Sequence, residues 1–205
     1  MTKTKENEYE KAYFYKRVIA YIIDVLIVSI VATIIALPFR TEAIKKVDNQ
    51  VIEVTQKALQ GKIKTDVYQS QMNELMYQKA KLDGIANIII ILLSVGNFIV
   101  YQGYTKGQTL GKKLMKIRIV KTNGKELTFN DLILRNLLNN FIFFDILLAV
   151  LALVGRKPYI YGYKYVNYIQ LTILIVSVFM IAIRSDGRSI MDLLVNTKVL
   201  KVEEK

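Results

Sequence analysis

One apolar run near the start of the sequence sets the strongest limit on how this chain folds. Residues Arg17–Leu37 form a run of about twenty residues, long enough to cross the hydrocarbon core of a bilayer as a helix. A single carboxylate, Asp24, interrupts the run, and a charge at that depth is costly unless it is paired or functional. Because a helix rises about 1.5 Å per residue, Asp24 lies about 10 Å deeper than Arg17 and on nearly the same face. The run predicts a transmembrane helix with a buried acidic group that needs a partner or a role.

Three further runs have the length and apolarity of membrane spans: Ile85–Tyr101, Leu137–Val154 and Val166–Ile183. The chain has 53% hydrophobic residues, above the roughly 45–50% of soluble domains. The first run lacks the short apolar core and small-residue cleavage site of a signal peptide, so the first helix is expected to be retained. The sequence predicts an all-α membrane protein, a bundle of four transmembrane helices in one domain, residues 1–205.

The distribution of basic residues predicts the orientation of the chain. Lysine and arginine are concentrated in residues 1–17 and 102–134, and cytoplasmic segments of membrane proteins carry such an excess. Both termini are therefore predicted to be cytoplasmic. The net charge of +12 then reflects topology and attraction to the anionic headgroups of the lipid bilayer. Nucleic-acid binding is not expected, because no basic stretch is interleaved with aromatic residues on a soluble fold.

The segment between the first two spans, residues 41–83, is predicted to be an extracytoplasmic insertion of two amphipathic helices. Apolar residues recur at helical spacing from Ile44 to Ala58, Gly61 interrupts the pattern, and it resumes from Tyr68. A helical hairpin accounts for this arrangement. Its apolar stripes either pack on each other or dock a partner or substrate.

A glycine pattern marks the segment between the second and third spans. Gly103, Gly107 and Gly111 recur every four residues, and on a helix this spacing makes a smooth ridge that another backbone can approach closely. The stretch around the last two also resembles a phosphate-binding loop. It has three residues instead of four between its glycines, and Lys113 stands where Ser or Thr should follow the lysine, so nucleotide binding is not expected. No cofactor is predicted.

A small β-containing cap is predicted on the cytoplasmic side. Met115–Lys121 alternates in polarity before Asn123-Gly124, a pair typical of a type I′ hairpin turn. The stretch Thr197–Val202 could add a third short strand to that hairpin.

The absence of two residue types limits the chemistry. The chain has no cysteine and no histidine, which excludes disulfides, thiol nucleophiles and imidazole metal sites. No metal site is predicted, and any proton handling must use carboxylates. A membrane hydrolase is not expected either, because the available serine and carboxylate nucleophiles lack a histidine base or a metal-ligand cluster. The chain is expected not to be an enzyme.

Polar side chains within the spans are expected to face the interior of the bundle, because lipid cannot satisfy them. The candidates for a polar cluster or transport pathway are Arg17, Asp24, Arg135, Asp145, Arg184 and Asp192. Two interpretations of Asp24 stay open: an ion pair with one of the three arginines that fixes helix packing, or a cation or proton site in a hydrated cleft. Asp192 has capping-box spacing from Ser189 and could merely cap a short helix. We predict that all but Asp145, for which the sequence indicates no partner, converge on one cluster.

Three stretches of the sequence, taken together, carry a family resemblance. They are Arg17 through Asp24, then Gly107-Gln108-Thr109-Leu110-Gly111-Lys112 continuing to Arg135, and finally Ser189 through Asp192. This combination resembles the RDD family of bacterial membrane proteins, which is named for one arginine and two aspartates; Arg17, Asp24 and Asp192 match those positions. Two departures are Met191, where members often have histidine, and Asn196, where they often have glycine. The first removes an ionisable neighbour of Asp192.

The resemblance implies a multi-pass protein of the bacterial cell membrane with a role in the transport of ligands that are not identified, and cation/proton exchange has been proposed for one member. We therefore expect transport of a small solute or cation, with Asp24 as the embedded acidic group. A homo-oligomer is expected, because four helices make a thin wall for a pathway. The alternative is an accessory or regulatory subunit of a membrane protease, secretion or sensing complex, docking through the 41–83 hairpin or the glycine ridge. A hydrated cleft at Asp24 would favour transport, and a dry Arg–Asp network with an exposed apolar stripe on the hairpin would favour the partner role.

Overall fold

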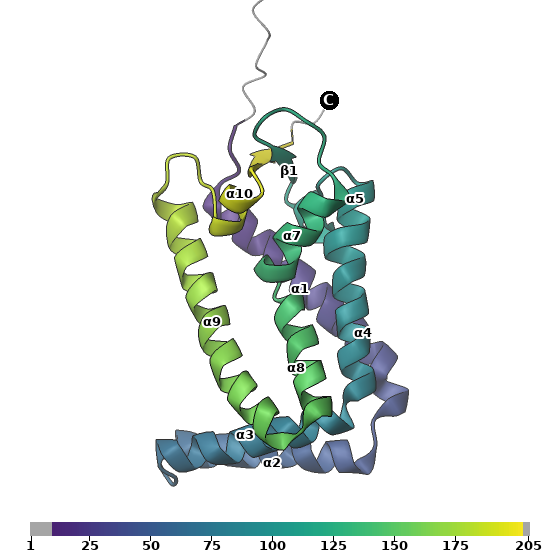
Figure 1. Cartoon of the computed structure of the whole chain (residues 1–205), viewed down its shortest axis with the longest axis vertical. Helices are drawn as coiled ribbons and strands as arrows, with labels where there is room; N and C mark the ends of the chain where they lie inside the picture. Colours follow the sequence, from purple (N-terminus) through teal and green to yellow (C-terminus); the bar gives the residue numbers. More distant parts are fainter. Residues whose placement is uncertain (1–9, 203–205) are drawn as a thin grey trace, which may run out of the picture. The chain divides into compact units, whose positions relative to one another are not determined.

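The computed structural model describes residues 10–202 and is mostly helical (Figure 1). Lys3 and Lys5, which contributed to the predicted orientation, lie outside these residues. The chain divides into two compact units: residues 1–28, 94–140 and 173–205 form unit 1, and residues 29–93 and 141–172 form unit 2. The elements are α1 (Phe14–Ala36), η1 (Leu37–Phe39), α2 (Glu42–Leu59), α3 (Thr65–Leu82), α4 (Gly84–Val95), the π-helical turn η2 (Gly96–Tyr101), α5 (Gln102–Tyr104), α6 (Leu110–Leu114), β1 (Ile117–Lys121), α7 (Phe129–Asn139), α8 (Ile142–Val154), α9 (Arg156–Ile183), α10 (Ile190–Leu194) and β2 (Thr197–Lys201).

Within the described residues, three helical stretches are long and apolar enough to cross a membrane: Phe14–Phe39, Gly84–Tyr104 and Arg156–Ile183. A fourth span is obtained only if α7 and α8 count as one broken span. The fold is that of a helical, multi-pass membrane protein with three or four spans. The side of the membrane on which each terminus lies stays a prediction.

The predicted third span, Leu137–Val154, is not one continuous helix. Helix α7 ends at Asn139, and Phe141 adopts a left-handed φ of 58° before α8 begins. Consecutive asparagines favour this break, because their side chains compete with the helix backbone for hydrogen bonds. The Asn140 side chain does so here, donating from Nδ2 to Asn136 Oδ1 at 2.6 Å.

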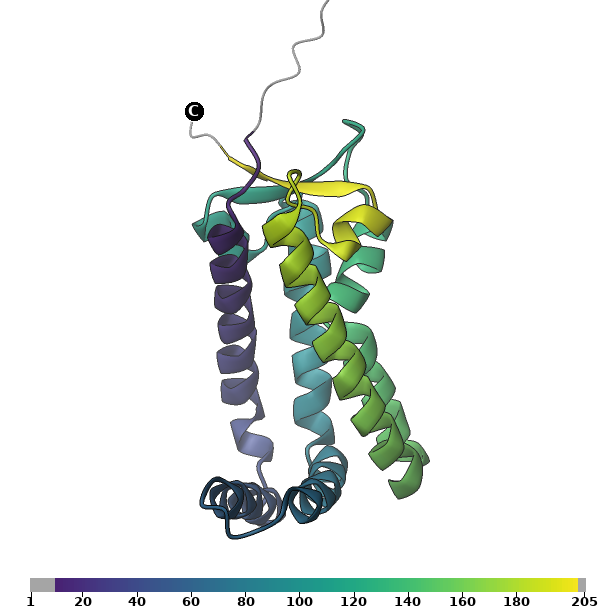
Figure 2. The same cartoon turned by 90° about the vertical axis from the view of Figure 1, so that its left-hand side faces the viewer.

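Unit 2 contains the two amphipathic helices predicted between the first two spans. Helices α2 and α3 pack side by side, and Figure 2 looks along their axes. Thr41 caps α2 by accepting the N–H of Ile44 at 3.3 Å, and Gly61 beyond its end has a φ of 67°, a conformation that glycine adopts without strain. Ile44 and Leu75 are buried within the unit. That this pair lies outside the cell stays a prediction.

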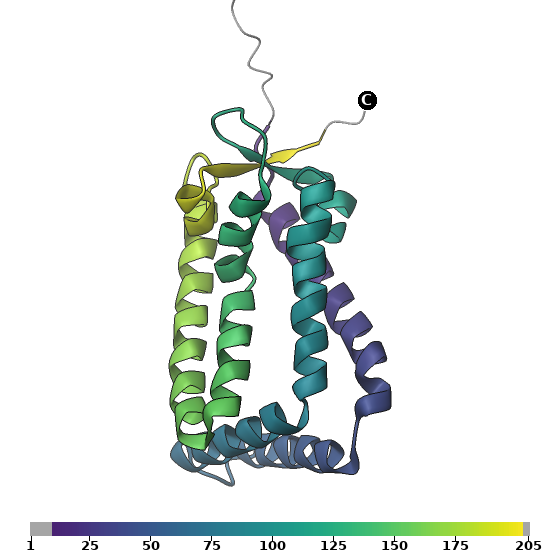
Figure 3. The same ribbon diagram turned by 45° about the vertical axis from the view of Figure 1, so that its right-hand side comes forward.

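Unit 1 contains a two-stranded antiparallel sheet made of β1 and β2 (Figure 3). Ile119 pairs with Val199, and both face the same buried cluster as Ile117 because side chains alternate across a strand. The prediction that Met115–Lys121 and Thr197–Val202 contribute strands to one sheet is confirmed, but the predicted hairpin at Asn123-Gly124 is wrong. Strand β1 pairs with the C-terminal strand instead, and the residues after the turn lead directly into α7.

The predicted glycine ridge does not form. Gly103 lies in α5, Gly107 in the following loop and Gly111 in α6, so the three share no helix face. Two of these positions nevertheless require glycine because another backbone segment approaches them closely. A Cβ on Gly107, whose φ is 103°, would lie 2.2 Å from the carbonyl oxygen of Ile119, and a Cβ on Gly111 would lie 2.1 Å from that of Ala20. These glycines let the loop and α6 pack directly on the backbones of β1 and α1.

Candidate functional site

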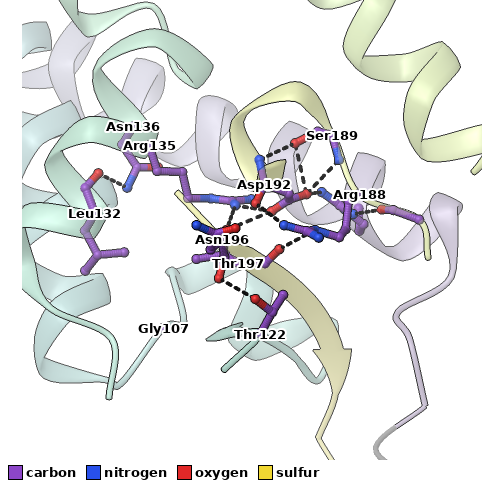
Figure 4. Close-up of polar contacts among 12 residues, drawn as sticks. Gly107, Thr122, Leu132, Arg135, Asn136, Arg188, Ser189, Asp192, Asn196 and Thr197 are labelled. Atoms are coloured by element: carbon purple, nitrogen blue, oxygen red, sulfur yellow. Dashed lines mark hydrogen bonds and ion pairs between the residues drawn. The ribbon is translucent and has the colours of Figure 1, made fainter. Parts of the chain in front are cut away.

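Asp192 is fully buried at the start of α10 and is bonded through both oxygens (Figure 4). Its Oδ2 accepts hydrogen bonds from the N–H and the hydroxyl of Ser189, both at 2.9 Å, which completes the predicted capping box. Arg17 Nη2 donates to the same oxygen at 2.6 Å, and Arg135 Nη1 donates to Oδ1. Asp192 therefore caps its own helix and also binds two guanidinium groups. We call Arg17, Arg135 and Asp192 the arginine cluster.

The arginine cluster holds Asp192 in its charged form. Burial opposes ionisation, but the guanidinium groups of Arg135 and Arg17 outweigh it and hold the pKa of Asp192 well below its usual range. Arg135 is 4% exposed and donates also to Thr197 Oγ1 at 2.7 Å, while Arg17 donates to the carbonyl of Gly187. Two cations share one carboxylate, so the cluster carries excess positive charge.

Arg188, and not the predicted Arg184, bonds to the residues around Asp192. Arg184 is exposed and forms two hydrogen bonds to Asp186, at 2.8 and 2.9 Å, so the prediction that it joins the cluster is wrong. A carboxylate two residues away satisfies it outside the cluster. Arg188 donates instead to the backbone carbonyls of Asp192 and Thr197, each at 3.0 Å (Figure 4). No local signal in the sequence distinguishes these two arginines.

Asn196, one of the two departures from the family pattern, follows α10 with a φ of 53°. Asparagine tolerates this left-handed conformation better than most residues, and glycine adopts it freely. The backbone at this position therefore explains why asparagine can stand where family members often have glycine. The Asn196 backbone also stabilises the start of β2, since its carbonyl accepts a hydrogen bond from the N–H of Thr122 at 2.9 Å.

Asp24 has a separate set of hydrogen bonds within unit 1. It is 1% exposed and accepts from Asn97 Nδ2 at 3.0 Å, from the N–H of Gly111 at 2.8 Å and from the hydroxyl of Thr109. All three donors are neutral, and no ion pair to Asp24 is found between residues 10 and 202. Arg17, one of the three arginines considered as its partner, is bound to Asp192 instead. Both aspartates act electrostatically on Lys112, but among residues 10–202 no direct bond joins Asp24 to the arginine cluster.

The residues around Asp24 explain the motif between Gly107 and Lys112. Thr109 caps α6 by accepting the N–H of Lys112 at 3.3 Å, and its hydroxyl donates to Asp24. Gln108 Nε2 donates to the carbonyl of Ile117 at 3.0 Å. Together they fasten the loop and α6 onto α1 and β1. We call Asp24, Asn97, Thr109 and Gly111 the Asp24 clamp. Each of these residues is polar or small, but nothing in the sequence indicated that they contact one another.

A cavity of about 170 Å³ lies in unit 1 next to the arginine cluster. Its polar and charged lining consists of Arg17, Tyr21, Lys112, Arg135, Asn139, Asn140 and Ser177. Its apolar lining consists of Phe14, Val18, Ile117, Leu174, Val178, Ile181 and Val199. Asp24 is not part of this lining, so the cavity is bordered by cations and amides rather than by the embedded carboxylate.

Two lining residues have polar atoms that the protein satisfies poorly. The Lys112 ammonium lies 3.4 Å from Thr109 Oγ1 and, with the Gln102 amide turned to accept, 3.1 Å from its oxygen. No carboxylate among residues 10–202 is within ion-pair distance of it. Burial lowers the pKa of Lys112 to about 7, opposed by Asp24 and reinforced by the arginines of the cluster. Ser177 on α9 is 9% exposed, and its hydroxyl has no hydrogen-bond partner in the described part of the chain.

Asp145 belongs to unit 2, where it occupies the first turn of α8. The N-terminal end of a helix dipole favours a carboxylate at such a position. No group of three or more acidic side chains in the described residues is arranged to hold a metal ion.

Comparison with known proteins places these features in a family. No curated protein and no solved structure matches the chain. The profile of the RDD family matches residues 11–196, a range that contains the arginine cluster, the Asp24 clamp and the cavity-lining residues up to Ile181. The two aspartates that match the family name thus occupy two different bonding environments. This chain belongs to the RDD family.

Proposed function

We propose that this integral membrane protein transports a small solute, which binds in the cavity lined by Arg17, Lys112 and Arg135. The observation that carries the proposal is the cavity itself: it brings charged and amide groups together beside helices long enough to span a membrane. Buried charges that line a cavity within membrane spans commonly mark a substrate or ion pathway. We further propose a bacterial cell membrane location, cytoplasmic termini and a homo-oligomer.

The charges of the cavity argue against a cation as the solute. A cation there would meet two guanidinium groups and an ammonium, whereas the carboxylate expected to bind it, Asp24, is occupied by three hydrogen-bond donors and does not line the cavity. Exchange of a cation or proton through Asp24 would first require opening the Asp24 clamp. A neutral or anionic solute requires no such step.

The experiment is uptake into proteoliposomes that contain the full chain. Radiolabelled phosphate, glycerol and sodium ion serve as the anionic, neutral and cationic probes. We expect uptake of phosphate or glycerol above that of empty liposomes, lowered by Lys112→Gln and retained by Lys113→Gln, since Lys113 is an exposed neighbour on the same short helix that does not line the cavity. Uptake of sodium alone, unchanged by Lys112→Gln, would refute the proposal.

A second function, that of an accessory subunit, is favoured by one observation in unit 2. Helix α2 leaves two large apolar residues uncovered, Ile52 at 55% and Leu59 at 83% exposed, which is the kind of stripe expected of a docking surface. A photocrosslinker placed at Leu59 in living cells tests this. One defined protein adduct would support docking, and adducts to lipid alone would argue against it.

A further inference from the structure

The cavity has more positive charge around it than the protein neutralises. Arg17, Lys112 and Arg135 line it, and two carboxylates, Asp24 and Asp192, act on Lys112 electrostatically. Asp192 is already bound to both arginines, and Asp24 to the donors of its clamp. When Lys112 is protonated, three cations against two carboxylates leave one positive charge beside a partly apolar space. Since an uncompensated charge away from water is costly, an anion in the cavity would stabilise the protein.

The unpartnered hydroxyl of Ser177 is a second, independent indication of a ligand. It comes from α9, whereas the cations come from α1, α6 and α7, so the polar groups reach the cavity from four elements. A buried hydroxyl without a partner is rare in native proteins and suggests a bonded group that is not part of the chain. A hydroxyl beside an ammonium and guanidinium groups is a donor set suited to the oxygens of a phosphate group.

The apolar part of the lining suggests which phosphate compounds fit. Phe14, Leu174 and Val178 are 40%, 45% and 37% exposed on helices that are candidate membrane spans, so they can contact lipid chains. A water molecule needs only about 10–15 Å³, so the cavity of about 170 Å³ can take a headgroup-sized anion. A ligand with an anionic head and an apolar tail would use both parts of the lining.

We propose that this cavity binds a phosphate group, supplied either by the headgroup of an anionic lipid or by free phosphate. This inference rests on the proposed function because it concerns the same cavity. It requires that the ligand binds there, but not that the ligand is transported. The apolar rim favours the lipid source. Lys112 and Ser177 are the residues whose polar atoms this ligand would satisfy.

The test is isothermal titration calorimetry on the full chain in a neutral detergent. Three probes are titrated: dihexanoyl phosphatidylglycerol, dihexanoyl phosphatidylcholine and inorganic phosphate. Saturable binding of phosphatidylglycerol at least about tenfold tighter than that of phosphatidylcholine supports the lipid headgroup, since the pair differs in net charge. Inorganic phosphate binding as tightly as phosphatidylglycerol supports the free anion. Equal binding of the two lipids with none of phosphate, or no saturable binding at all, overturns the proposal.

Matched variants separate this site from general attraction to a basic protein. Lys112→Gln should weaken binding of the preferred probe by about tenfold or more, and Ser177→Ala by roughly two- to tenfold, because the first loses a charged and the second a neutral hydrogen bond. Lys113→Gln, which removes the same charge outside the cavity lining, should change it less than twofold. Melting curves confirm that each variant is folded. Equal losses for Lys112→Gln and Lys113→Gln would show that no built site exists.

The pH dependence of phosphatidylglycerol binding sharpens the assignment. The phosphodiester keeps its charge between about pH 6 and 8.5. Lys112, whose charged neighbours are Arg17, Arg135, Asp24 and Asp192, loses its proton in that range. Affinity should therefore fall as the pH rises, and Lys112→Gln should lose this trend. Binding without uptake would refute transport and keep this site, whereas uptake of glycerol without anion binding would refute the site and keep transport.

Discussion

The two family aspartates of this chain, Asp24 and Asp192, are equally inaccessible yet held in opposite ways. Asp24 accepts three hydrogen bonds from neutral donors on η2, α6 and the loop before α6. Asp192 accepts from a capping serine and from two guanidinium groups. The first carboxylate fastens a loop to a helix, and the second neutralises cations. Neither the burial of the two aspartates nor their match to the family name distinguishes these roles. The charge of the hydrogen-bond donors distinguishes them.

The largest loss of stability should come from Asp192→Asn. The amide can still cap α10, but Arg17 and Arg135 lose the carboxylate that they share. Arg135 is buried and Arg17 largely so, and the expected cost is about 3–5 kcal/mol in the free energy of unfolding. The control is Asp186→Asn, which breaks an exposed pair worth no more than about 1 kcal/mol. Denaturant or thermal unfolding in detergent measures both. A smaller loss for Asp192→Asn than for the control would show that the arginine cluster is not structural.

Gly111→Ala should have the next largest effect, because it acts on the Asp24 clamp through the backbone. The new methyl group would lie 2.1 Å from the carbonyl oxygen of Ala20, which has to move, at a cost of about 1–3 kcal/mol. Gly84→Ala is the matched control, because no atom lies within 4 Å of its added Cβ. If both alanine variants melt at the wild-type temperature, the close approach of α6 to α1 is wrong.

Asp24→Asn should cost less, about 1–2 kcal/mol. Its amide oxygen can keep the bonds from Asn97 and Gly111, and its amide nitrogen can donate to Thr109, whose hydroxyl can reverse its direction. The stability that is lost comes from hydrogen bonds to a charged acceptor, which are stronger than those to a neutral amide. Thr109→Val should cost at least as much, since the clamp and the cap of α6 both lose a partner. A loss for Asp24→Asn as large as that for Asp192→Asn would mean that Asp24 also neutralises a buried cation.

The smallest expected effect is a pH dependence carried by Lys112, because its side chain is only partly buried and solvent screens its charge. Its pKa is about 7 in the folded protein, against about 10.4 for a solvated lysine. The unfolded chain therefore binds more protons between these values, and this contribution to stability rises as the pH increases from about 7 to 10. Lys112→Gln should flatten that part of the curve of melting temperature against pH relative to Lys113→Gln. Identical slopes for the two variants would contradict the lowered pKa of Lys112.

The sequence predicted local features of unit 1 and part of how they combine. The capping box of Ser189 and the C-terminal strand are confirmed because a cap and a strand depend on neighbouring residues. A shared sheet for β1 and β2 and the convergence of Arg17 with Asp192 were predicted, although these residues are more than 70 positions apart. The hairpin was not found, because the local turn at Asn123-Gly124 leads into α7 instead of a second strand. Asp24 next to Arg17 on one helix face indicated an ion pair, but a competing carboxylate from α10 binds the arginine instead. The cavity depends on packing that no spacing reveals.

The most direct test of the account is to measure uptake and stability together for Asp24→Asn in proteoliposomes. Asp24 belongs to the clamp and the solute binds at Lys112, so the variant should melt at a lower temperature. Because burial lowers the pKa of Lys112 and the charge of Asp24 raises it, uptake is measured at about pH 6, where Lys112 is protonated. Uptake per folded protein, for whichever probe the wild type carries, should then stay within about twofold of wild type. Lys112→Gln should show the reverse, with little change in folding and a clear loss of uptake. Abolished uptake by Asp24→Asn in a protein that melts at the wild-type temperature would contradict the account and make Asp24 the transport site.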